Sequence, residues 1–418
     1  MQRPINMAGL LLFTPNKMPK LRILFVASYF PPVSGGAAMT LARLVDALQD
    51  YEVAVVSEHP KNFEGIHNAQ IPAGIVTWKV RALHSWIHQF SPSPFRKWAR
   101  RRLAGSATQV IRRAIKDWRP SHVVAVYPSA TMLESAWRAV AGTGCLLVPY
   151  FFDDPEGKLP HVLNDSAAVL ALTRGVQASI LEKTGQRSIH VPHIAPEAPA
   201  QACRKSSRIH LTKLLNTALD GRHVIAHTGS VEGLQIDGLR DMIEAMRQWP
   251  GREPLLVIST PSPAEAKYAL AGAADMEQVR VLNLSPSELV HLQVGADLLL
   301  AILPLEGDLE SFGRTCFPTK IMDYLNCGTP MVVRGPAGSV LCQHASSGGY
   351  AAVVTEKGPT PLLEAAASIL GSKERQALLL QHARKASLEF SAPSIVPRFL
   401  DALNRVSQPH GDCSDGPP

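Results

Sequence analysis

A short apolar run followed by a glycine loop and an amphipathic helix most constrains how this chain can fold. The run 21–27 has the length of a strand and is almost entirely apolar, which is typical of a parallel strand buried on both faces. The loop FPPVSGG at 30–36 cannot continue that strand, and apolar residues then recur at helical spacing over 41–48. A second apolar run at 52–56 completes a strand, helix, strand unit, whose crossover is right-handed by default.

The same alternation continues along the chain. In the first half it predicts further strands at 122–126, 145–151, 168–173 and 188–192. A proline- and alanine-rich stretch at 192–200 is typical of a linker. Beyond it the alternation predicts strands at 223–226, 254–259, 279–284, 297–302 and 330–333. With 418 residues, 46% of them hydrophobic, the chain can form two α/β domains and is not mainly disordered.

These patterns predict two Rossmann-like, doubly wound parallel-sheet domains facing a central cleft. Ligands of such sheets bind beyond the carboxyl ends of the strands. The start of one helix is predicted specifically, because Ser285 and Glu288 have capping-box spacing around a proline at the first helical position. The predicted segments are an extension at 1–20, domains at 21–199 and 200–385, a helix at 386–406 that could cross back to the first domain, and a disordered tail at 407–418.

The FPPVSGG loop is the first candidate for ligand binding. Gly35 and Gly36 let the backbone approach a ligand closely, and the following helix offers free N–H groups to a phosphate. The loop lacks the GxGxxG spacing of a dinucleotide site. A tight turn that needs a positive φ is the alternative interpretation.

The second candidate is the segment FPTKIMDYLNCGTP at 317–330. Thr319 is placed to cap a short helix that Gly328 ends, and Lys320 and Asp323 share one face of it. A lysine at a helix start is unfavourable unless an anion is held there. A diphosphate could supply that anion, with Asp323 accepting hydrogen bonds from ribose hydroxyls. The alternative is a surface ion pair between Lys320 and Asp323, worth under ~1 kcal/mol.

Taken together, FPPVSGG, HTGS at 227–230 and FPTKIMDYLNCGTP resemble the retaining glycosyltransferases of family 4, which have the GT-B fold, and in particular a subgroup with an FPTK-type donor motif. The resemblance spans about 21–405. It implies a nucleotide sugar bound mainly by the second domain, an acceptor against the first, and no cofactor or divalent cation. The donor-binding residues it implies are Gly35, Gly36, Gly229, Ser230, Glu310, Thr319, Lys320 and Asp323.

The sequence departs from the family pattern at two places. The family carries two glutamates separated by seven residues; Asp323 fills the second position, but Thr315 stands at the first, and Glu310 fits only with an insertion. The family also places an arginine and a lysine after Gly229-Ser230. In this chain the stretch from Val231 to Asp237 contains neither an arginine nor a lysine. Arg314 and Lys320 therefore become the expected phosphate-binding cations.

Asp153 and Asp154 follow a predicted strand in the first domain, where the resemblance implies the acceptor side. Either carboxylate could orient a sugar hydroxyl, or Asp153 could cap the next segment. The predicted catalytic residues are Lys320, Arg314 and Asp153. No HxxxH or HExxH pattern occurs, so no metal site is expected. The six scattered cysteines suggest a reduced, cytoplasmic protein.

The net charge of +7 comes from one segment. Between Lys79 and Arg119 there are eleven Lys and Arg and one Asp, so this segment carries +10 and the remainder −3. Tryptophans interleave with the cations, which suits contact with anionic lipid on the inner face of the cell membrane. A solvated basic face and nucleic-acid binding are the alternatives, the latter disfavoured because no nucleic-acid module accompanies the segment. The predicted membrane-facing residues are Arg96, Lys97, Trp98, Arg100, Arg101 and Arg102.

The sequence therefore predicts a peripheral membrane glycosyltransferase that transfers a sugar from a nucleoside diphosphate sugar to a lipid-linked or saccharide acceptor, with retention, in the synthesis of a cell-surface polysaccharide or glycoconjugate. Two alternatives keep the fold. One is a catalytically degenerate partner subunit, suggested by the missing basic pair. The other is a sugar-nucleotide epimerase, which would need acid and base residues that the sequence does not assemble.

Overall fold

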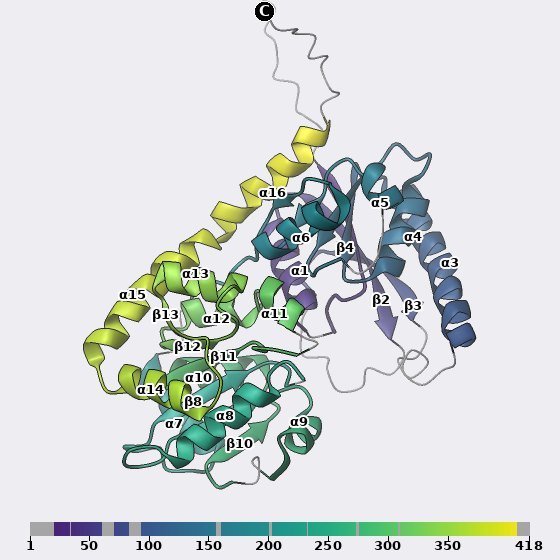
Figure 1. Ribbon diagram of the computed structural model, residues 1–418. Coiled ribbons are helices and arrows are strands. Elements are labelled where there is room, and N and C mark those ends of the chain that lie inside the picture. The colour runs from purple at the N-terminus through teal and green to yellow at the C-terminus, as the bar shows by residue number, and fades with distance from the viewer. Residues whose placement is uncertain are drawn as a thin grey trace, which may run out of the picture.

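The protein consists of two α/β lobes, each built on one parallel sheet (Figure 1). The computed structural model describes residues 21–33, 35–60, 71–82, 93–155, 160–199, 203–231, 233–272, 276–307 and 310–407. In the N-terminal sheet the strand order is β3-β2-β1-β4-β5-β6-β7, and in the C-terminal sheet it is β10-β9-β8-β11-β12-β13. In both sheets the order reverses beside the first strand of the domain, which is where ligands of doubly wound folds bind.

The N-terminal domain alternates strands and helices. Its strands are β1 (Arg22–Ala27), β2 (Glu52–Pro60), β3 (Val76–Ala82), β4 (His122–Tyr127), β5 (Leu146–Phe151), β6 (Leu170–Ala171) and β7 (Ile189–His190). Its helices are α1 (Gly36–Ala47), α3 (Ser93–Trp118), α4 (Ala130–Val140), α5 (Pro160–Asn164) and α6 (Arg174–Thr184).

The C-terminal domain repeats this plan. Its strands are β8 (Val224–Thr228), β9 (Leu255–Ser259), β10 (Val279–Leu282), β11 (Leu298–Ile302), β12 (Met331–Arg334) and β13 (Ala351–Val354). Its helices are α7 (Arg204–Leu214), α8 (Ile236–Arg247), α9 (Pro263–Leu270), α10 (Pro286–Gly295), α11 (Glu310–Thr315), α12 (Lys320–Asn326), α13 (Val340–Gly348), α14 (Pro359–Leu370) and α15 (Lys373–Glu389). A last helix, α16 (Ala392–Ser407), follows.

Each sheet is buried on both faces, which explains the apolar strands. Alternate residues of β1 enter two different cores: Leu24 packs on the side of α3 and α4, and Phe25 on the side of α1 and α16. The C-terminal sheet is covered in the same way by α7, α10, α12, α13 and α15 on one face and by α8, α9 and α14 on the other. The predicted capping box forms at the start of α10, with Pro286 at the first helical position.

Helix α16 leaves the C-terminal domain and packs on the N-terminal sheet. In Figure 1 the yellow helix runs from the lower lobe to the upper one. Ile395, Phe399 and Leu403 are fully buried there, and the Phe399 ring stacks on Phe25 at 6.0 Å between centroids. The chain thus crosses between the lobes twice, once near Ala195 and once near Phe390, and the backbone N–H of Ala195 donates to the Phe390 carbonyl at 2.8 Å.

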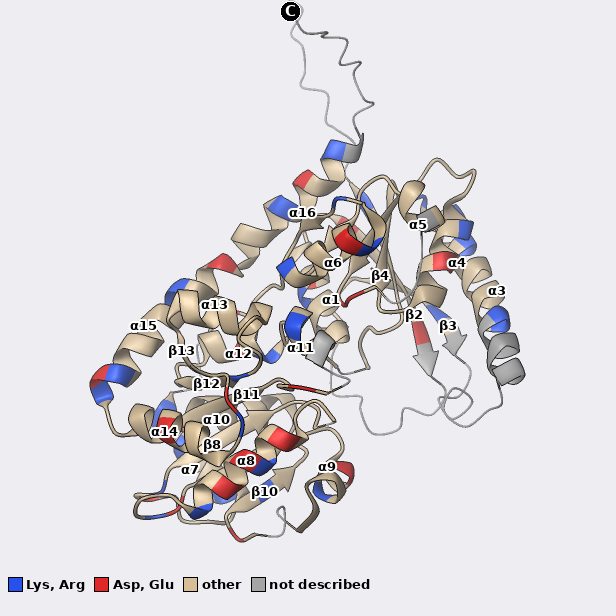
Figure 2. Cartoon of the chain, in the orientation of Figure 1, with Lys and Arg blue, Asp and Glu red and all other residues tan. Residues whose placement is uncertain are grey.

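Helix α3 lies entirely within the basic segment, and the second half of the helix packs in the core of the domain. Leu103, Ala107 and Ile111 are buried against the sheet, whereas Arg101 and Arg102 are exposed. Lys and Arg residues recur along α3 (Figure 2). The side chains of the predicted membrane-facing residues Arg96, Lys97, Trp98 and Arg100 lie outside the described residues. From residue 103 onward the apolar face of α3 packs in the core of the N-terminal domain, so only its charged face is available to contact a membrane surface.

No helix in the described part of the chain combines the length and the apolar character that crossing a membrane requires.

Candidate functional site

The two motifs of the C-terminal domain meet where β8 ends and α12 begins. Gly229 follows β8 with a φ of 105°, a conformation that L side chains rarely adopt. A methyl group on Gly229 would also lie 3.3 Å from both Cε and Nζ of Lys320. The glycine therefore serves two purposes: it makes the turn, and it leaves room for the lysine to lie against the backbone.

Lys320 is held by a histidine from the other motif. Its Nζ lies 3.1 Å from Nε2 of His227, a fully buried residue of β8. The Nδ1 of His227 lies 2.9 Å from the Leu300 carbonyl, which can only accept, so we assign the proton to Nδ1. Nε2 is then an acceptor for the lysine. This assignment fits the electrostatics, because burial and the adjacent Lys320 both lower the pKa of His227.

The environment of Lys320 disfavours its charge. Burial lowers its pKa to about 7 from an ordinary 10.5. Among the described residues no carboxylate forms an ion pair with Lys320, and its electrostatic neighbour is Cys316, whose own pKa burial raises to about 12. A partly buried lysine with a lowered pKa and no carboxylate partner among the described residues suits the binding of an anion.

The glycine loop of the N-terminal domain faces this site. A methyl group on Gly36, the first residue of α1, would lie 3.2 Å from Oγ1 of Thr319. The Thr319 hydroxyl donates across the domain boundary to the Gly36 carbonyl at 3.2 Å and lies 3.1 Å from Oγ1 of Thr40. The prediction that Thr319 caps α12 is therefore wrong: it makes no capping hydrogen bond, because its hydroxyl has partners in the other domain. Gly35 precedes α1 with a φ of 151°.

Asp323 lies one turn after Lys320 and binds an arginine of the N-terminal domain. Its Oδ1 accepts from Nη2 of Arg43 on α1 at 2.5 Å. The side chains are 14% and 27% exposed for Arg43 and Asp323, so the pair is largely shielded from water. Burial raises the pKa of Asp323, and Arg43 opposes that shift.

His193 connects the two domains beside this pair. Its Nε2 lies 2.9 Å from the Phe317 carbonyl and its Nδ1 lies 3.0 Å from Oγ1 of Thr40. The residue is 4% exposed, and burial lowers its pKa to about 4, so it stays neutral. Both ring nitrogens are used by protein partners, which agrees with the structural role that is the usual one for a lone histidine.

Ser230, Glu310 and Arg314 are the remaining predicted residues of the C-terminal domain. Ser230 is exposed directly after Gly229. Glu310 begins α11, but its side chain lies outside the described residues. Arg314 is exposed at the end of the same helix. Its Nη1 lies close to Gly338, since a methyl group added to that glycine would be only 3.1 Å away. The backbone of α11 also contacts the N-terminal domain, because the Thr173 hydroxyl donates to the Thr315 carbonyl at 2.9 Å.

The two acidic residues after β5 have different surroundings. Asp154 accepts from the Ser179 hydroxyl at 2.5 Å and from Lys183 Nζ at 2.7 Å, so it anchors α6 to the end of the sheet. Asp153 is half-buried and close enough to Cys316 to raise the pKa of that thiol. Asp153 thus faces the C-terminal domain, whereas the Asp154 carboxylate is engaged within its own domain.

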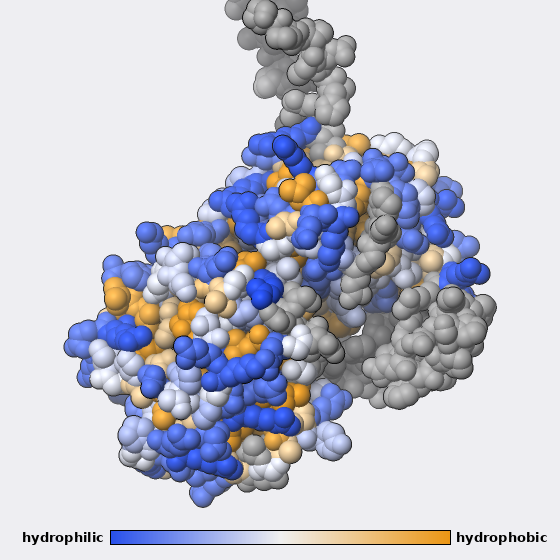
Figure 3. Space-filling model, in the orientation of Figure 1, coloured by the Kyte–Doolittle hydropathy of each residue, from blue (hydrophilic) through white to orange (hydrophobic). Residues whose placement is uncertain are grey.

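Two hollows lie at the carboxyl edges of the sheets. The larger, of about 700 Å³, lies at the ends of β11 and β12 and at the start of α8. Residues that line it include Gly238, Asp241, Leu303, Arg334 and Lys357. On the face of the C-terminal domain seen in Figure 3, hydrophobic residues are interspersed with hydrophilic ones.

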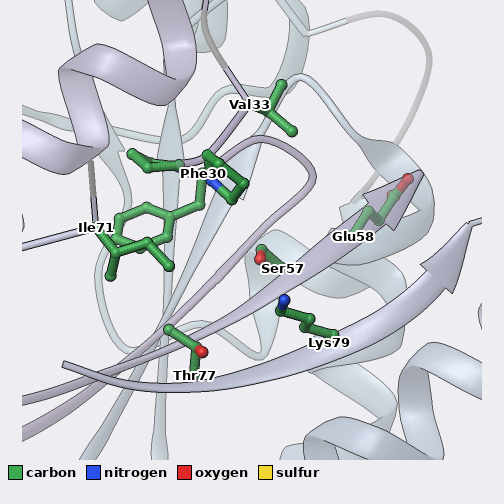
Figure 4. Close-up of a pocket in the computed structure, with 9 residues that line it drawn as sticks. Phe30, Val33, Ser57, Glu58, Ile71, Thr77 and Lys79 are labelled. Carbon is green, nitrogen blue, oxygen red and sulfur yellow. The ribbon is translucent and has the colours of Figure 1, made fainter. Parts of the chain in front are cut away.

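The smaller hollow lies in the N-terminal domain. Figure 4 shows Phe30 and Val33 of the loop after β1 opposite Glu58 of β2 and Lys79 of β3. Glu58 accepts from the Ser28 hydroxyl at 2.9 Å, and burial raises its pKa. Among the described residues, no group of three or more His, Cys, Asp or Glu side chains is arranged to hold a metal ion.

Neither a family model nor a curated protein sequence matches the chain. Solved structures with a similar fold do exist. HepE of Anabaena in complex with UDP-glucose has a TM-score of 0.67 at 15% identity, with 92% of this chain and 100% of HepE covered. A glycosyltransferase from Rickettsia africae has a TM-score of 0.68 at 14% identity, with 94% and 100% covered. UDP-GlcNAc 2-epimerase from Neisseria meningitidis, bound to UDP-GlcNAc, has a TM-score of 0.54 at 12% identity, with 92% and 100% covered.

These similarities and the two parallel sheets confirm the GT-B fold predicted from the sequence. At such identities the likeness concerns the fold alone. Membership of family 4 and the role of the FPTK motif stay predictions.

Three residues of the site were missed by the sequence analysis: His227, Arg43 and Thr40. His227 stands two residues before Gly229, inside a motif already singled out. Arg43 and Thr40 share with Gly36 the face of α1 that meets α12, so the i, i+4, i+7 spacing from the glycine loop was a usable signal.

Proposed function

We propose that this protein is a retaining, metal-independent glycosyltransferase that uses a nucleoside diphosphate sugar as donor. The observation that carries the proposal is Lys320, a partly buried lysine beside Gly229 that has no carboxylate partner among the described residues. A donor diphosphate supplies the missing negative charge. The structural neighbours HepE and the epimerase were solved with UDP-glucose and UDP-GlcNAc, which supports a nucleotide sugar as the ligand class.

In this proposal the donor spans the boundary between the domains. The diphosphate lies against Lys320 and the backbone at Gly229, with Arg314 as a second cation and Gly36 at the helix start opposite. Asp323 accepts hydrogen bonds from ribose hydroxyls. The missing basic pair after Gly229-Ser230 is compensated by Lys320, whose ammonium lies next to that loop.

The transfer step needs no enzymic nucleophile. The bond between the anomeric carbon and the leaving phosphate oxygen breaks while a hydroxyl of the acceptor attacks from the same side. The proton of that hydroxyl passes to an oxygen of the leaving diphosphate, and configuration is retained. Lys320 stabilises the charge that develops on the leaving group, which is the larger part of the protein's contribution. Domain contact over the donor excludes water.

The acceptor is proposed to be lipid-linked or a saccharide, bound on the N-terminal domain near Asp153, in cell-surface glycoconjugate synthesis. Contact with anionic lipid is proposed to be electrostatic, through the charged face of α3, because its apolar side from 103 onward is buried. Each cation near such a surface contributes about 1 kcal/mol. Co-sedimentation with phosphatidylserine vesicles should weaken when Arg101 and Arg102 become Gln, and unchanged binding would contradict the contact.

The donor proposal is tested with the purified protein and a panel of UDP-, GDP- and dTDP-sugars. Isothermal titration calorimetry should detect binding of at least one donor, and Lys320→Met should abolish it. Lys213→Met, which changes an exposed lysine of α7 in the same domain, is the matched control and should bind normally. NMR analysis of the products then separates the alternatives: transfer to an acceptor supports the proposal, and formation of an epimer without acceptor indicates an epimerase. Absence of donor binding would indicate a degenerate partner subunit.

A further inference from the structure

Helix α1 of the N-terminal domain and helix α12 of the C-terminal domain contact each other at two positions along their length. On α1, Gly36 and Thr40 contact Thr319 at the start of α12. One turn further along both helices, Arg43 contacts Asp323. The spacing of three residues from Thr40 to Arg43 and of four from Thr319 to Asp323 places each set on one helical face. The contact therefore fixes where α12 lies against α1 and how it is rotated.

The arginine in this contact is not there for stability alone. Removing a guanidinium and a carboxylate from water is costly, and a well-packed apolar pair often stabilises a protein as much as a buried ion pair does. Arg43 also leaves Nη1 buried with no hydrogen-bond partner among the described residues. A charge retained under these conditions between two domains points to a role in the site that the domains share.

We propose that Arg43 is a positioning residue for ribose recognition: by binding one carboxylate oxygen of Asp323, it orients the carboxylate and leaves the other oxygen to accept from the ribose hydroxyls of the donor. The inference rests on the proposed function, since it assigns a partner to the residue that is proposed to bind ribose. Through Arg43 the N-terminal domain takes part in recognising the nucleotide, although it supplies no direct contact to the ribose.

The charged and titratable groups near Asp323 are few. Arg43 faces it from α1, and Tyr324 and Cys327 are close to it from its own segment. His193 is close to Arg43 and is neutral. Burial raises the pKa of Asp323, and the Arg43 guanidinium opposes that rise. Removing the guanidinium therefore raises the pKa of Asp323 further, and a protonated carboxyl is a poorer acceptor for hydroxyl groups.

The test compares UDP and GDP with their 2′,3′-dideoxy counterparts by calorimetry between pH 6.5 and 8.5. The ratio of the two affinities reports recognition of the ribose hydroxyls, separately from the diphosphate. The wild type should prefer the ribonucleotide at least tenfold throughout. In Arg43→Met the preference should fall below about threefold, with the larger loss at pH 6.5. Arg43→Lys, which keeps the charge, should retain most of the preference at both pH values.

Asn326→Ala is the matched control. It removes another contact of α12, the 2.6 Å hydrogen bond to the Pro196 carbonyl, without touching Asp323, so its ratio should equal that of the wild type. An unchanged ratio in Arg43→Met would overturn the inference, as would an equal loss in Asn326→Ala. If Arg43→Met does not fold, Arg43→Gln tests the same point, because it also removes the positive charge. If the wild type binds neither nucleotide, the proposed function itself fails, which is a different result.

Discussion

Replacing Lys320 by Met should stabilise the ligand-free protein and abolish nucleotide binding. The folded protein lowers the pKa of Lys320 to about 7, whereas an unfolded chain restores the ordinary 10.5. Each tenfold change in the protonation constant corresponds to about 1.4 kcal/mol, so below pH 7 the buried lysine costs the folded state up to about 5 kcal/mol. Methionine has a similar length and no charge, but it leaves Nε2 of His227 without its donor, which costs about 1 kcal/mol.

The effect has a defined pH dependence. Between pH 7 and 10.5 the unfolded chain binds a proton at Lys320 that the folded protein does not, so the stability of the wild type rises with pH in that window. The variant lacks this rise. Its advantage over the wild type should therefore be largest at pH 6.5 and smaller by about 3 kcal/mol at pH 9.5, as follows from the two pKa values.

The assay is urea denaturation of both proteins at pH 6.5 and pH 9.5, followed by calorimetry with the best-binding nucleotide. Lys213→Met should show neither effect. If Lys320→Met is destabilised at pH 6.5, or if its stability relative to the wild type does not change between the two pH values, the lysine is not held as a buried cation. If the variant still binds nucleotide normally, Lys320 does not contact the diphosphate.

Four further predictions concern nucleotide binding at Lys320 and Gly229 and the stability of the N-terminal domain. Nucleotide affinity of the wild type should fall several-fold from pH 7 to 8.5, because Lys320 loses its proton above its lowered pKa; a flat profile in calorimetry would contradict this. Gly229→Ala should weaken nucleotide binding and lower the free energy of unfolding by about 1–3 kcal/mol, since alanine is strained at a φ of 105° and crowds Lys320. Phe399→Ala should cost about 3–5 kcal/mol in chemical denaturation, and a loss under 1 kcal/mol would mean that α16 is not part of the N-terminal core. Asp154→Asn should reduce stability and leave donor binding unchanged; lost transfer at wild-type stability would instead give Asp154 the acceptor role.

Much of the fold could be predicted because the signals are local. Strands such as β8 and β11 are apolar on both faces only in a parallel sheet with helices on both sides, and Ser285 and Glu288 close their capping box within three residues. The glycines at 36 and 229 were also visible, since each permits a close approach that a side chain would crowd.

The parts that failed or were missed depend on contacts between distant residues. Thr319 has the sequence context of a helix cap, but a hydroxyl group 279 residues away competes successfully for it. Arg43 is separated from Asp323 by 280 residues, so its spacing from the glycine loop on α1 marks its helical face but does not identify its partner. The sheet covers the apolar side of α3 from Leu103 onward, which the sequence did not reveal, while contact of its charged side with lipid stays a prediction.

The double crossing of the chain limits how the two lobes can move. One covalent connection would let them swing and twist in any direction, but here two connections pass between them, joined to each other by the hydrogen bond from Ala195 to Phe390. Because the two connections lie side by side at this hydrogen bond, they restrict the twisting between the lobes that a single connection would allow. A protease cut at either crossing alone would leave the lobes attached by the other. The pairing of α1 with α12 lies beside the first crossing, because His193 bonds to Thr40 of α1 and Asn326 of α12 donates to the Pro196 carbonyl, so a movement of the lobes at the crossings also acts on this contact.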